Sequence, residues 1–286
     1  MPDSEFAGLP GPGDDLPQRA AAIVRAATNL VPRVCVVLGS GLGPALGDSL
    51  TEEASFGFEH LPGFPPPGVP GHAGKLVLGR LAGVEVAAFF GRIHFYEGHG
   101  MDVPALLPRL ARELGAETIV LTAAVGGLVP QLRAGSVVIL SDHLNLMGTA
   151  PMRAWRYPDG KPAFVGMSDV YDRELGELAL GRAEALGIPA ADGVYAAMSG
   201  PAYETPTEVA FLSLAGATVV GMSMVPEAVP ARALRMRVLG LCSVTNAFGE
   251  HVEHEEVVRV SNETAIAVGR LLVDLLPRIP KDRPED

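Results

Sequence analysis

The sequence predicts an α/β domain in which a central sheet is flanked by helices. Apolar runs that suit buried strands alternate with helical segments, and no internal repeat interrupts the alternation. Polar residues gather where the predicted strands end, and open α/β sheets bind ligands at such strand-end crevices. These observations indicate one domain with a small-molecule site along an edge of its sheet.

The predicted helices are marked by their end signals. Proline begins the segments 17–29 and 206–215, and glycine follows the segments 103–114 and 172–186. Pro108 argues for a bend or a later start in the segment 103–114, and Pro230 weakens a further helix over 227–234. An apolar stripe at helical spacing predicts the last helix, over 254–275.

The predicted strands are short apolar runs rich in β-branched residues. They cover residues 34–38, 75–81, 84–90, 117–121, 136–141, 193–198, 217–222 and 237–245. The second and third form a hairpin around Ala82 and Gly83. Residues 60–75, with five prolines, and residues 147–166 are expected to be irregular.

The composition limits the kind of partner. Hydrophobic residues make up 48% of the 286 residues, charged residues 19%, and the net charge is −11. This charge disfavours nucleic acid and anionic membranes, and no run approaches the roughly 20 apolar residues of a membrane span. We expect a soluble cytoplasmic protein, in which an anionic substrate needs a local cationic pocket.

The ends of the chain and its cysteines give further expectations. Residues 1–16 lack the features of a signal peptide and predict a flexible tail before a single domain over 17–286. Cys35 and Cys242 lie in strand-like runs, which is typical of reduced packing residues. His251, His254 and Glu255 could ligate a metal, but polar residues at a helix start are commoner, so we expect no metal or cofactor.

Residues 91–99 follow a buried strand and carry the clearest functional signal. If this stretch stays extended, Arg92, His94 and Tyr96 share one side, and Ile93, Phe95 and Glu97 the other. A fixed cation beside a titratable ring suits a small anion. The alternative is a surface hairpin with an Arg92–Glu97 ion pair.

Other strand ends add polar groups to this candidate site. The glycine-rich turn 39–43 follows a strand and offers backbone N–H groups and the Ser40 hydroxyl, but it fits neither a dinucleotide fingerprint nor a P-loop. Ser223 joins the possible anion site, while Glu204 and Asn246 form a carboxylate–amide pair. No nucleophile elbow surrounds Ser40.

Six blocks together resemble the trimeric purine nucleoside phosphorylases. They are Gly-Ser-Gly-Leu-Gly at 39–43, Pro-Gly-His-Ala-Gly at 70–74, Gly-Arg-Ile-His-Phe-Tyr-Glu-Gly at 91–98, Gly-Pro-Ala-Tyr-Glu-Thr at 200–205, Gly-Met-Ser-Met-Val-Pro-Glu at 221–227 and Val-Thr-Asn at 244–246. The resemblance implies a single α/β domain with a central mixed β-sheet of the nucleoside phosphorylase type. It also implies a homotrimer that cleaves purine nucleosides with inorganic phosphate as co-substrate.

The resemblance assigns roles to residues of this chain. Phosphate would be held by Ser40, Arg92, His94, the Ala124 backbone N–H and Ser223, with His72 closing over it. The nucleoside would contact Tyr96, Met222 and His254 at the ribose, Tyr203 at the purine face, and Glu204 and Asn246 at the purine edge. Thr245 also belongs to the expected nucleoside-binding residues. His94, Glu204 and Asn246 would be catalytic, and Phe164 would be lent to a neighbouring subunit.

Glu204 and Asn246 suggest the base. A carboxylate accepts a hydrogen bond from N1–H, which a 6-oxopurine has and adenine lacks, so inosine and guanosine are expected in purine salvage. Ala123 departs from the family, which has asparagine there. One alternative is a phosphorylase of methylthioadenosine or another 6-aminopurine nucleoside. The other is a nucleoside-binding protein without turnover.

Overall fold

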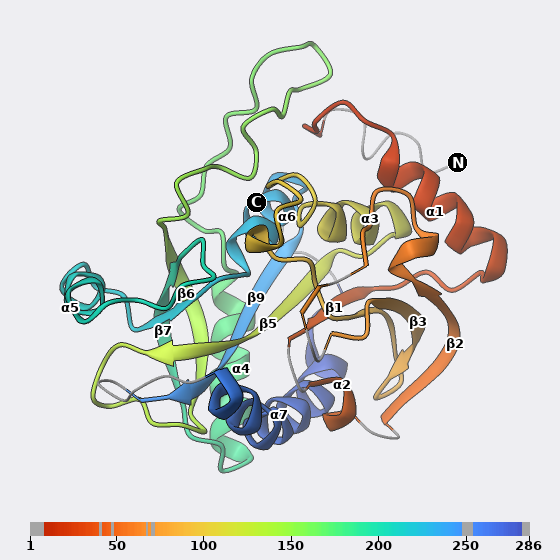
Figure 1. The fold of residues 1–286 in the computed structure, drawn as a ribbon. Coiled ribbons are helices and arrows are strands. Elements are labelled where there is room, and N and C mark those ends of the chain that lie inside the picture. Colours follow the sequence, from red (N-terminus) through yellow and green to blue (C-terminus); the bar gives the residue numbers. More distant parts are fainter. Residues whose placement is uncertain are drawn as a thin grey trace.

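The computed structural model describes residues 9–39, 42–46, 49–66, 68–69, 72–247 and 254–281. Within these residues nine strands form one mixed sheet, in the order β2-β3-β4-β1-β5-β8-β7-β6-β9 (Figure 1). The strands are β1 Val34–Leu38, β2 Leu50–Gly57, β3 Lys75–Leu81, β4 Val84–Phe90, β5 Thr118–Gly127, β6 Val137–Asn145, β7 Ala190–Ala197, β8 Val219–Gly221 and β9 Arg237–Asn246.

Helices connect and cover these strands. The α-helices are α1 Leu16–Ala27, α2 Leu42–Ala45, α3 Leu106–Leu114, α4 Arg173–Ala185, α5 Pro206–Leu214, α6 Val225–Ala233 and α7 His254–Leu275. The 3-10 turns given for the described residues are η2 Phe58–His60, η3 Phe95–Glu97 and η4 Leu276–Arg278. None of the helices in the described part of the chain has the length and apolar character needed to cross a membrane.

The strand pairing brings several strand ends to one edge. β1 pairs in parallel with β4 and β5, and β5 pairs in parallel with β9, so these four strands end on the same side. β5 also pairs with β8, and further pairings through β7 and β6 lead back to β9. This part of the sheet therefore closes into a ring, which the sequence did not indicate.

Two hydrophobic clusters lie on opposite faces of the sheet. Cys35 and Val37 of β1 point into the cluster under α1, α3 and α6, while Val34, Val36 and Leu38 point into the cluster under α2, α4 and α7 (Figure 1). This alternation is the period of two that a strand imposes on its side chains. Burial on both faces explains why the run is wholly apolar.

The predicted fold class is confirmed, and the differences concern single elements. β2 was missed, because this edge strand is largely exposed and its acidic residues hide the apolar pattern. α3 begins at Leu106, later than residue 103, and α6 begins at Val225 with Pro226 in its first turn. β5 continues through the small residues 122–127 that we took for the end of the strand.

The segment 147–166 and the residues before α1 pack together. Gly11 pairs with Arg156, and Trp155 is buried beneath them. Asp14 binds Arg109, whose guanidinium lies 5.9 Å from the Trp155 ring. Residues 9–15, which belong to the predicted tail, therefore contact the domain, and the domain boundaries at 16 and 17 remain a prediction.

Candidate active site

The residues after β4 form the centre of the candidate site. Gly91 has a φ of +107°, and a Cβ there would collide with His72, so glycine allows the two segments to approach closely. His72 Nδ1 lies 3.0 Å from the Arg92 backbone nitrogen and 3.1 Å from the Arg92 carbonyl oxygen, so the Arg92 backbone holds the ring in place. Burial, with the charge of nearby His94, lowers the pKa of His72 to about 4. The His72 ring is thus neutral at neutral pH.

The stretch 91–99 is not extended throughout, so that prediction is wrong. Residues 95–97 form the turn η3, and Glu97 folds back onto His94. Its Oε1 accepts from the His94 backbone N–H at 2.6 Å and lies 3.0 Å from His94 Nδ1. A turn brings the carboxylate to the side of His94, whereas an extended chain would have separated the two.

Glu97 is held as a carboxylate. Burial opposes its ionisation, but hydrogen bonds from His94 and from the Gly68 backbone N–H outweigh burial and lower the pKa of Glu97 to about 2. Glu97 therefore supports the loop through its bonds to the backbone of His94 and Gly68. The His94 ring also stacks on Tyr96 with centroids 4.7 Å apart, and its centroid lies 5.1 Å from that of His72.

Arg92 forms a buried ion pair, but not with Glu97. Its Nε and Nη2 donate to the two carboxylate oxygens of Glu227 at 2.9 and 3.1 Å, and its Nη1 donates to the Thr122 carbonyl at 2.6 Å. Both side chains of the pair are 2% exposed. The alternative of a surface hairpin with an Arg92–Glu97 pair is therefore wrong.

Ser223 lies on the segment that leads into α6. Its backbone N–H donates to the buried Tyr195 hydroxyl at 3.0 Å. The next residue, Met224, has φ +62° and ψ −51°, and Val225 N–H donates to the Ser223 carbonyl at 2.8 Å. This is a γ-turn at a non-glycine residue, a strained conformation that is common beside functional sites.

The end of β1 exposes the backbone of β5. Pairing between β1 and β5 stops at Val37 and Leu121, and the Gly39 N–H then bonds the Thr122 hydroxyl at 2.8 Å. Ala124 follows in β5 and is partly exposed, whereas Ala123 is buried. Ser40, the predicted hydroxyl of this turn, lies outside the described residues.

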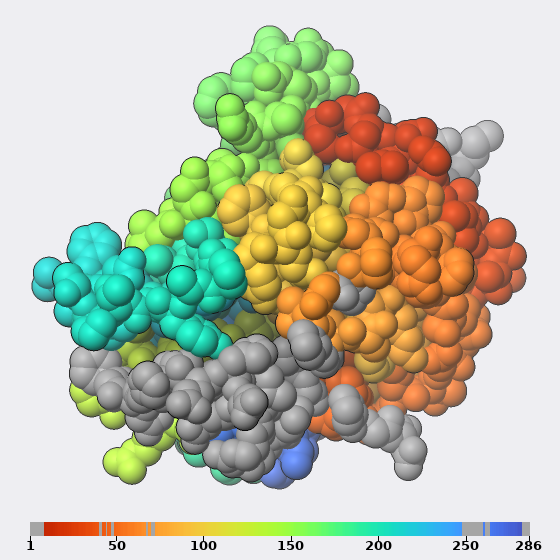
Figure 2. Space-filling view, viewed as in Figure 1, coloured from red at the N-terminus to blue at the C-terminus, as the bar shows by residue number. Residues whose placement is uncertain are grey.

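The residues that the resemblance assigns to a nucleoside adjoin this cluster. A Cβ on Gly200 would overlap Met222 Sδ and lie 3.0 Å from Tyr96 Cδ1, so the two predicted ribose contacts flank one glycine. In the space-filling view, the yellow surface around residues 90–105 meets the blue-green surface around residues 195–205 (Figure 2). Tyr203 is exposed, and burial raises the pKa of Glu204.

Asn246 ends β9 beside β5. Its Nδ2 would lie 3.1 Å from a Cβ on Gly126, so the amide occupies space that glycine leaves open. Thr245 Oγ1 lies 3.1 Å from Asn246 Oδ1 and 3.2 Å from the Val125 carbonyl. Thr245 is buried and Asn246 is partly exposed, so Thr245 can hold the Asn246 amide in place while that amide remains accessible.

Some predicted residues are not joined to the cluster within this chain. Phe164 is 86% exposed, on the green segment 147–166 that projects at the top of Figure 1. His254 begins α7, but its side chain lies outside the description. The sequence missed three supports: Glu227, Thr122 and Tyr195. The signal for Glu227 was present, since it ends the block 221–227.

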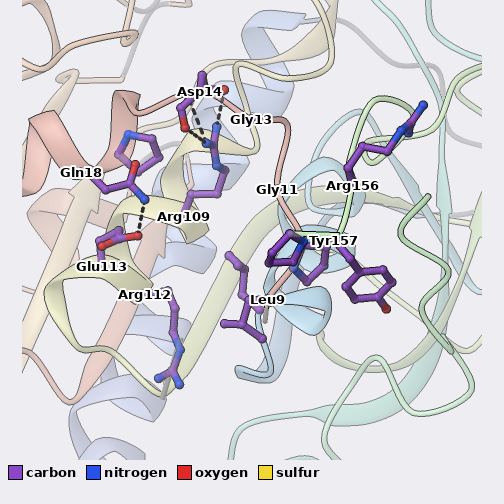
Figure 3. A pocket seen from close by; sticks show the side chains of 14 residues that line it. Leu9, Gly11, Gly13, Asp14, Gln18, Arg109, Arg112, Glu113, Arg156 and Tyr157 are labelled. Carbon is purple, nitrogen blue, oxygen red and sulfur yellow. Dashed lines mark hydrogen bonds and ion pairs between the residues drawn. The ribbon is translucent and has the colours of Figure 1, made fainter. Parts of the chain in front are cut away.

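A separate cavity of about 420 Å³ lies away from all predicted site residues. Figure 3 shows its wall, where Asp14 meets Arg109 and Gln18 meets Glu113. Side chains from α1, α3 and the segment 147–166 line it, among them Arg112, Arg156 and Tyr157. Among the described residues, no group of His, Cys, Asp or Glu is placed to hold a metal ion.

Comparison with known proteins identifies the family. The model of the phosphorylase superfamily matches residues 33–277. The chain belongs to this superfamily. Purine nucleoside phosphorylase 1 of Bacillus subtilis is 42% identical over 250 residues, covering 86% of this chain and 92% of that protein. The predicted resemblance is confirmed, and with it the enzyme class: a pentosyltransferase of the purine nucleoside phosphorylase kind.

Solved structures of the phosphorylase superfamily agree with this fold. A Schistosoma purine nucleoside phosphorylase in complex with hypoxanthine has a TM-score of 0.83 and 31% identity, covering 94% of this chain and 99% of that one. The Schistosoma mansoni enzyme in complex with adenosine has a TM-score of 0.84 and 32% identity, covering 95% and 99%. Hypoxanthine is a 6-oxopurine and adenosine is a 6-aminopurine nucleoside, so these two structures hold ligands of both classes.

Proposed function

We propose that this phosphorylase cleaves 6-oxopurine nucleosides, inosine and guanosine, to the free base and ribose 1-phosphate or deoxyribose 1-phosphate. The reaction is reversible and serves purine salvage. The observation that carries the proposal is the close approach of both Tyr96 and Met222 to Gly200. It joins the anion-holding groups to the segment that bears Glu204, as a reaction between phosphate and a nucleoside requires.

The phosphate half of the reaction follows from Arg92, His94 and His72. The Arg92 guanidinium donates to an anion beside the His72 ring, and Ser40, Ser223 and the Ala124 N–H complete the proposed set. As the C1′–N9 bond lengthens, the ribosyl group gains oxocarbenium character. A phosphate oxygen then forms the bond to C1′ from the opposite face, and the electron pair of the broken bond leaves with the purine.

The purine half follows from Glu204 and Asn246. The departing base gains negative charge, so a hydrogen bond from the Asn246 amide to N7 is strongest in the transition state, where it accelerates the reaction. A Glu204 carboxylate accepts from N1–H of a 6-oxopurine. Tyr203 packs on the base, and Tyr96, Met222 and His254 line the ribose.

One observation favours a second substrate class, the 6-aminopurine nucleosides. Burial raises the pKa of Glu204, although a backbone hydrogen bond opposes this shift. A protonated Glu204 would donate to N1 of adenine, where the carboxylate would be repelled. The rates of adenosine and methylthioadenosine cleavage, relative to the rate of inosine cleavage, should therefore rise as the pH falls.

We further propose a cytoplasmic homotrimer in which Phe164 of one subunit covers the ribose site of the next. Support comes from the exposure of Phe164, since a large aromatic side chain that is 86% exposed in one chain is suited to contact another. The reaction needs phosphate as co-substrate and no further cofactor.

The decisive experiment measures hypoxanthine release from inosine with and without phosphate. Phosphate-dependent release with ribose 1-phosphate as the second product is expected. Release without phosphate would indicate a hydrolase instead. Adenosine and methylthioadenosine serve as parallel substrates, and Glu204→Gln should lose the preference for inosine while retaining phosphate dependence.

A further inference from the structure

Glu227 is a buried carboxylate to which the reaction above gives no role. It lies in the first turn of α6 and is 1% exposed. Both of its oxygens accept from Arg92, at 2.9 and 3.1 Å. Two parallel bonds fix the plane of a guanidinium, which a single bond would leave free to turn.

The contacts of Arg92 divide its donors into two sets. A guanidinium has five N–H donors. Glu227 takes one on Nε and one on Nη2, and the Thr122 carbonyl takes one on Nη1. One N–H on each terminal nitrogen then has no acceptor among the described residues. Two such donors match two oxygens of a phosphate.

Ser223 and Glu227 are carried by the same short segment. The γ-turn at Met224 sets the direction in which α6 leaves β8, and Tyr195 fixes the turn through the Ser223 N–H. The position of the Ser223 backbone and the plane of the Arg92 guanidinium therefore depend on one backbone arrangement.

We propose that Glu227 is the positioning residue of the phosphate site, orienting Arg92 so that its two remaining N–H donors face phosphate beside Ser223. This inference rests on the proposed function, because it takes phosphate as the anion that Arg92 binds. The rival explanation is that Glu227 only neutralises a buried charge.

Glu227→Asp separates the two explanations. Aspartate keeps the negative charge but is shorter by one methylene, so it cannot hold Nε and Nη2 in the same place. We expect the Kd for inorganic phosphate, measured by calorimetry on the full chain, to rise at least tenfold. The KM for phosphate should rise in parallel, and the KM for inosine should stay within about twofold.

A double-mutant cycle tests whether Glu227 acts through Arg92. Arg92→Lys cannot form the paired bonds, so adding Glu227→Asp to it should weaken phosphate binding little further. Asp172→Asn is the matched control, because Asp172 binds Arg237 through two bonds of 2.6 and 2.8 Å elsewhere in the fold. It should lower the Tm and leave phosphate binding unchanged.

Each outcome decides the inference. An unchanged phosphate Kd in folded Glu227→Asp, or additive effects in the cycle, would overturn it. If Glu227→Asp does not fold, Glu227→Gln takes its place, with the same expected rise in Kd and the same overturning result. Calorimetry measures phosphate binding without turnover. A wild type that binds phosphate but does not cleave inosine would therefore contradict the proposed function and leave this inference standing.

Discussion

At the scale of single residues, the site depends on glycines, whose lack of a side chain leaves room for neighbouring groups. Gly91, Gly126 and Gly200 each leave room for a functional neighbour, namely His72, Asn246 and the Tyr96–Met222 pair. A larger residue at any of them pushes on a group whose position matters to a few tenths of an ångström. These glycines therefore determine the geometry of the site without touching the substrate.

Gly126→Ala tests this idea at the purine half. Its Cβ would lie 3.1 Å from Asn246 Nδ2 and 3.3 Å from Val220 Cγ1, so the amide must shift. We expect kcat/KM for inosine to fall about tenfold, because a displaced donor stabilises the departing base less. The control is Gly181→Ala, at a position with no atom within 4 Å of the new Cβ. Unchanged kinetics in Gly126→Ala would contradict the role given to Asn246.

His72 gives a prediction about pH. Its folded pKa of about 4 lies below the ordinary 6.5, so the folded protein binds fewer protons than the unfolded chain between these values. The stability that His72 contributes is complete above pH 6.5 and is lost as the pH falls toward 4. An NMR titration, with the signal assigned by its loss in His72→Asn, should show a midpoint well below 6.5. A midpoint near 6.5 would contradict a neutral His72 ring at neutral pH.

At the scale of elements, helix starts place the functional groups. α5 begins with a capping box in which the Thr205 hydroxyl accepts from the Glu208 N–H at 3.2 Å, and Glu208 accepts from the Thr205 N–H at 2.7 Å. Glu204 is the residue before this cap. The direction of the Glu204 backbone is thus set by a local interaction of α5.

Thr205→Ala should weaken the nucleoside half alone. Loss of a helix cap costs about 1 kcal/mol of stability, which we expect as a Tm lowered by a few degrees. Because Glu204 is then held less firmly, the KM for inosine should rise severalfold while the KM for phosphate stays constant. Thr205→Ser keeps the capping hydroxyl and should restore both values. A loss of phosphate affinity would show that the two halves are not separable.

At the scale of the whole molecule, the subunit exposes one side chain, Phe164, for which we propose a contact with a neighbouring subunit. The segment 147–166 is anchored by the buried side chain of Trp155, which is 1% exposed. The same segment carries Phe164 on the surface of the subunit. We expect size-exclusion chromatography coupled to light scattering to give the mass of a trimer. Phe164→Ala should raise the KM for inosine about tenfold without lowering the Tm, because Phe164 is 86% exposed within its own subunit. A fully active monomer would contradict the trimer.

The two hydrophobic clusters show how far the sequence predicts the fold. Runs such as Val34–Leu38 are apolar on every residue because both faces of the sheet are covered, and they were located correctly. β2 was missed, because an exposed edge strand needs no apolar pattern. The ring from β5 through β8 to β9 was also beyond the sequence, since strand pairing depends on residues distant in the chain.

The sequence by itself determined the family, the α/β class and the candidate residues Arg92, His94, Glu204, Ser223 and Asn246, because motifs and apolar runs are local and survive as patterns. Only the tertiary structure decided how these groups are held. It placed Glu227 on Arg92, 135 residues apart, and turned Glu97 onto His94. A charge buried during folding takes whichever partner the packed backbone brings within hydrogen-bond distance, and no local pattern records that choice.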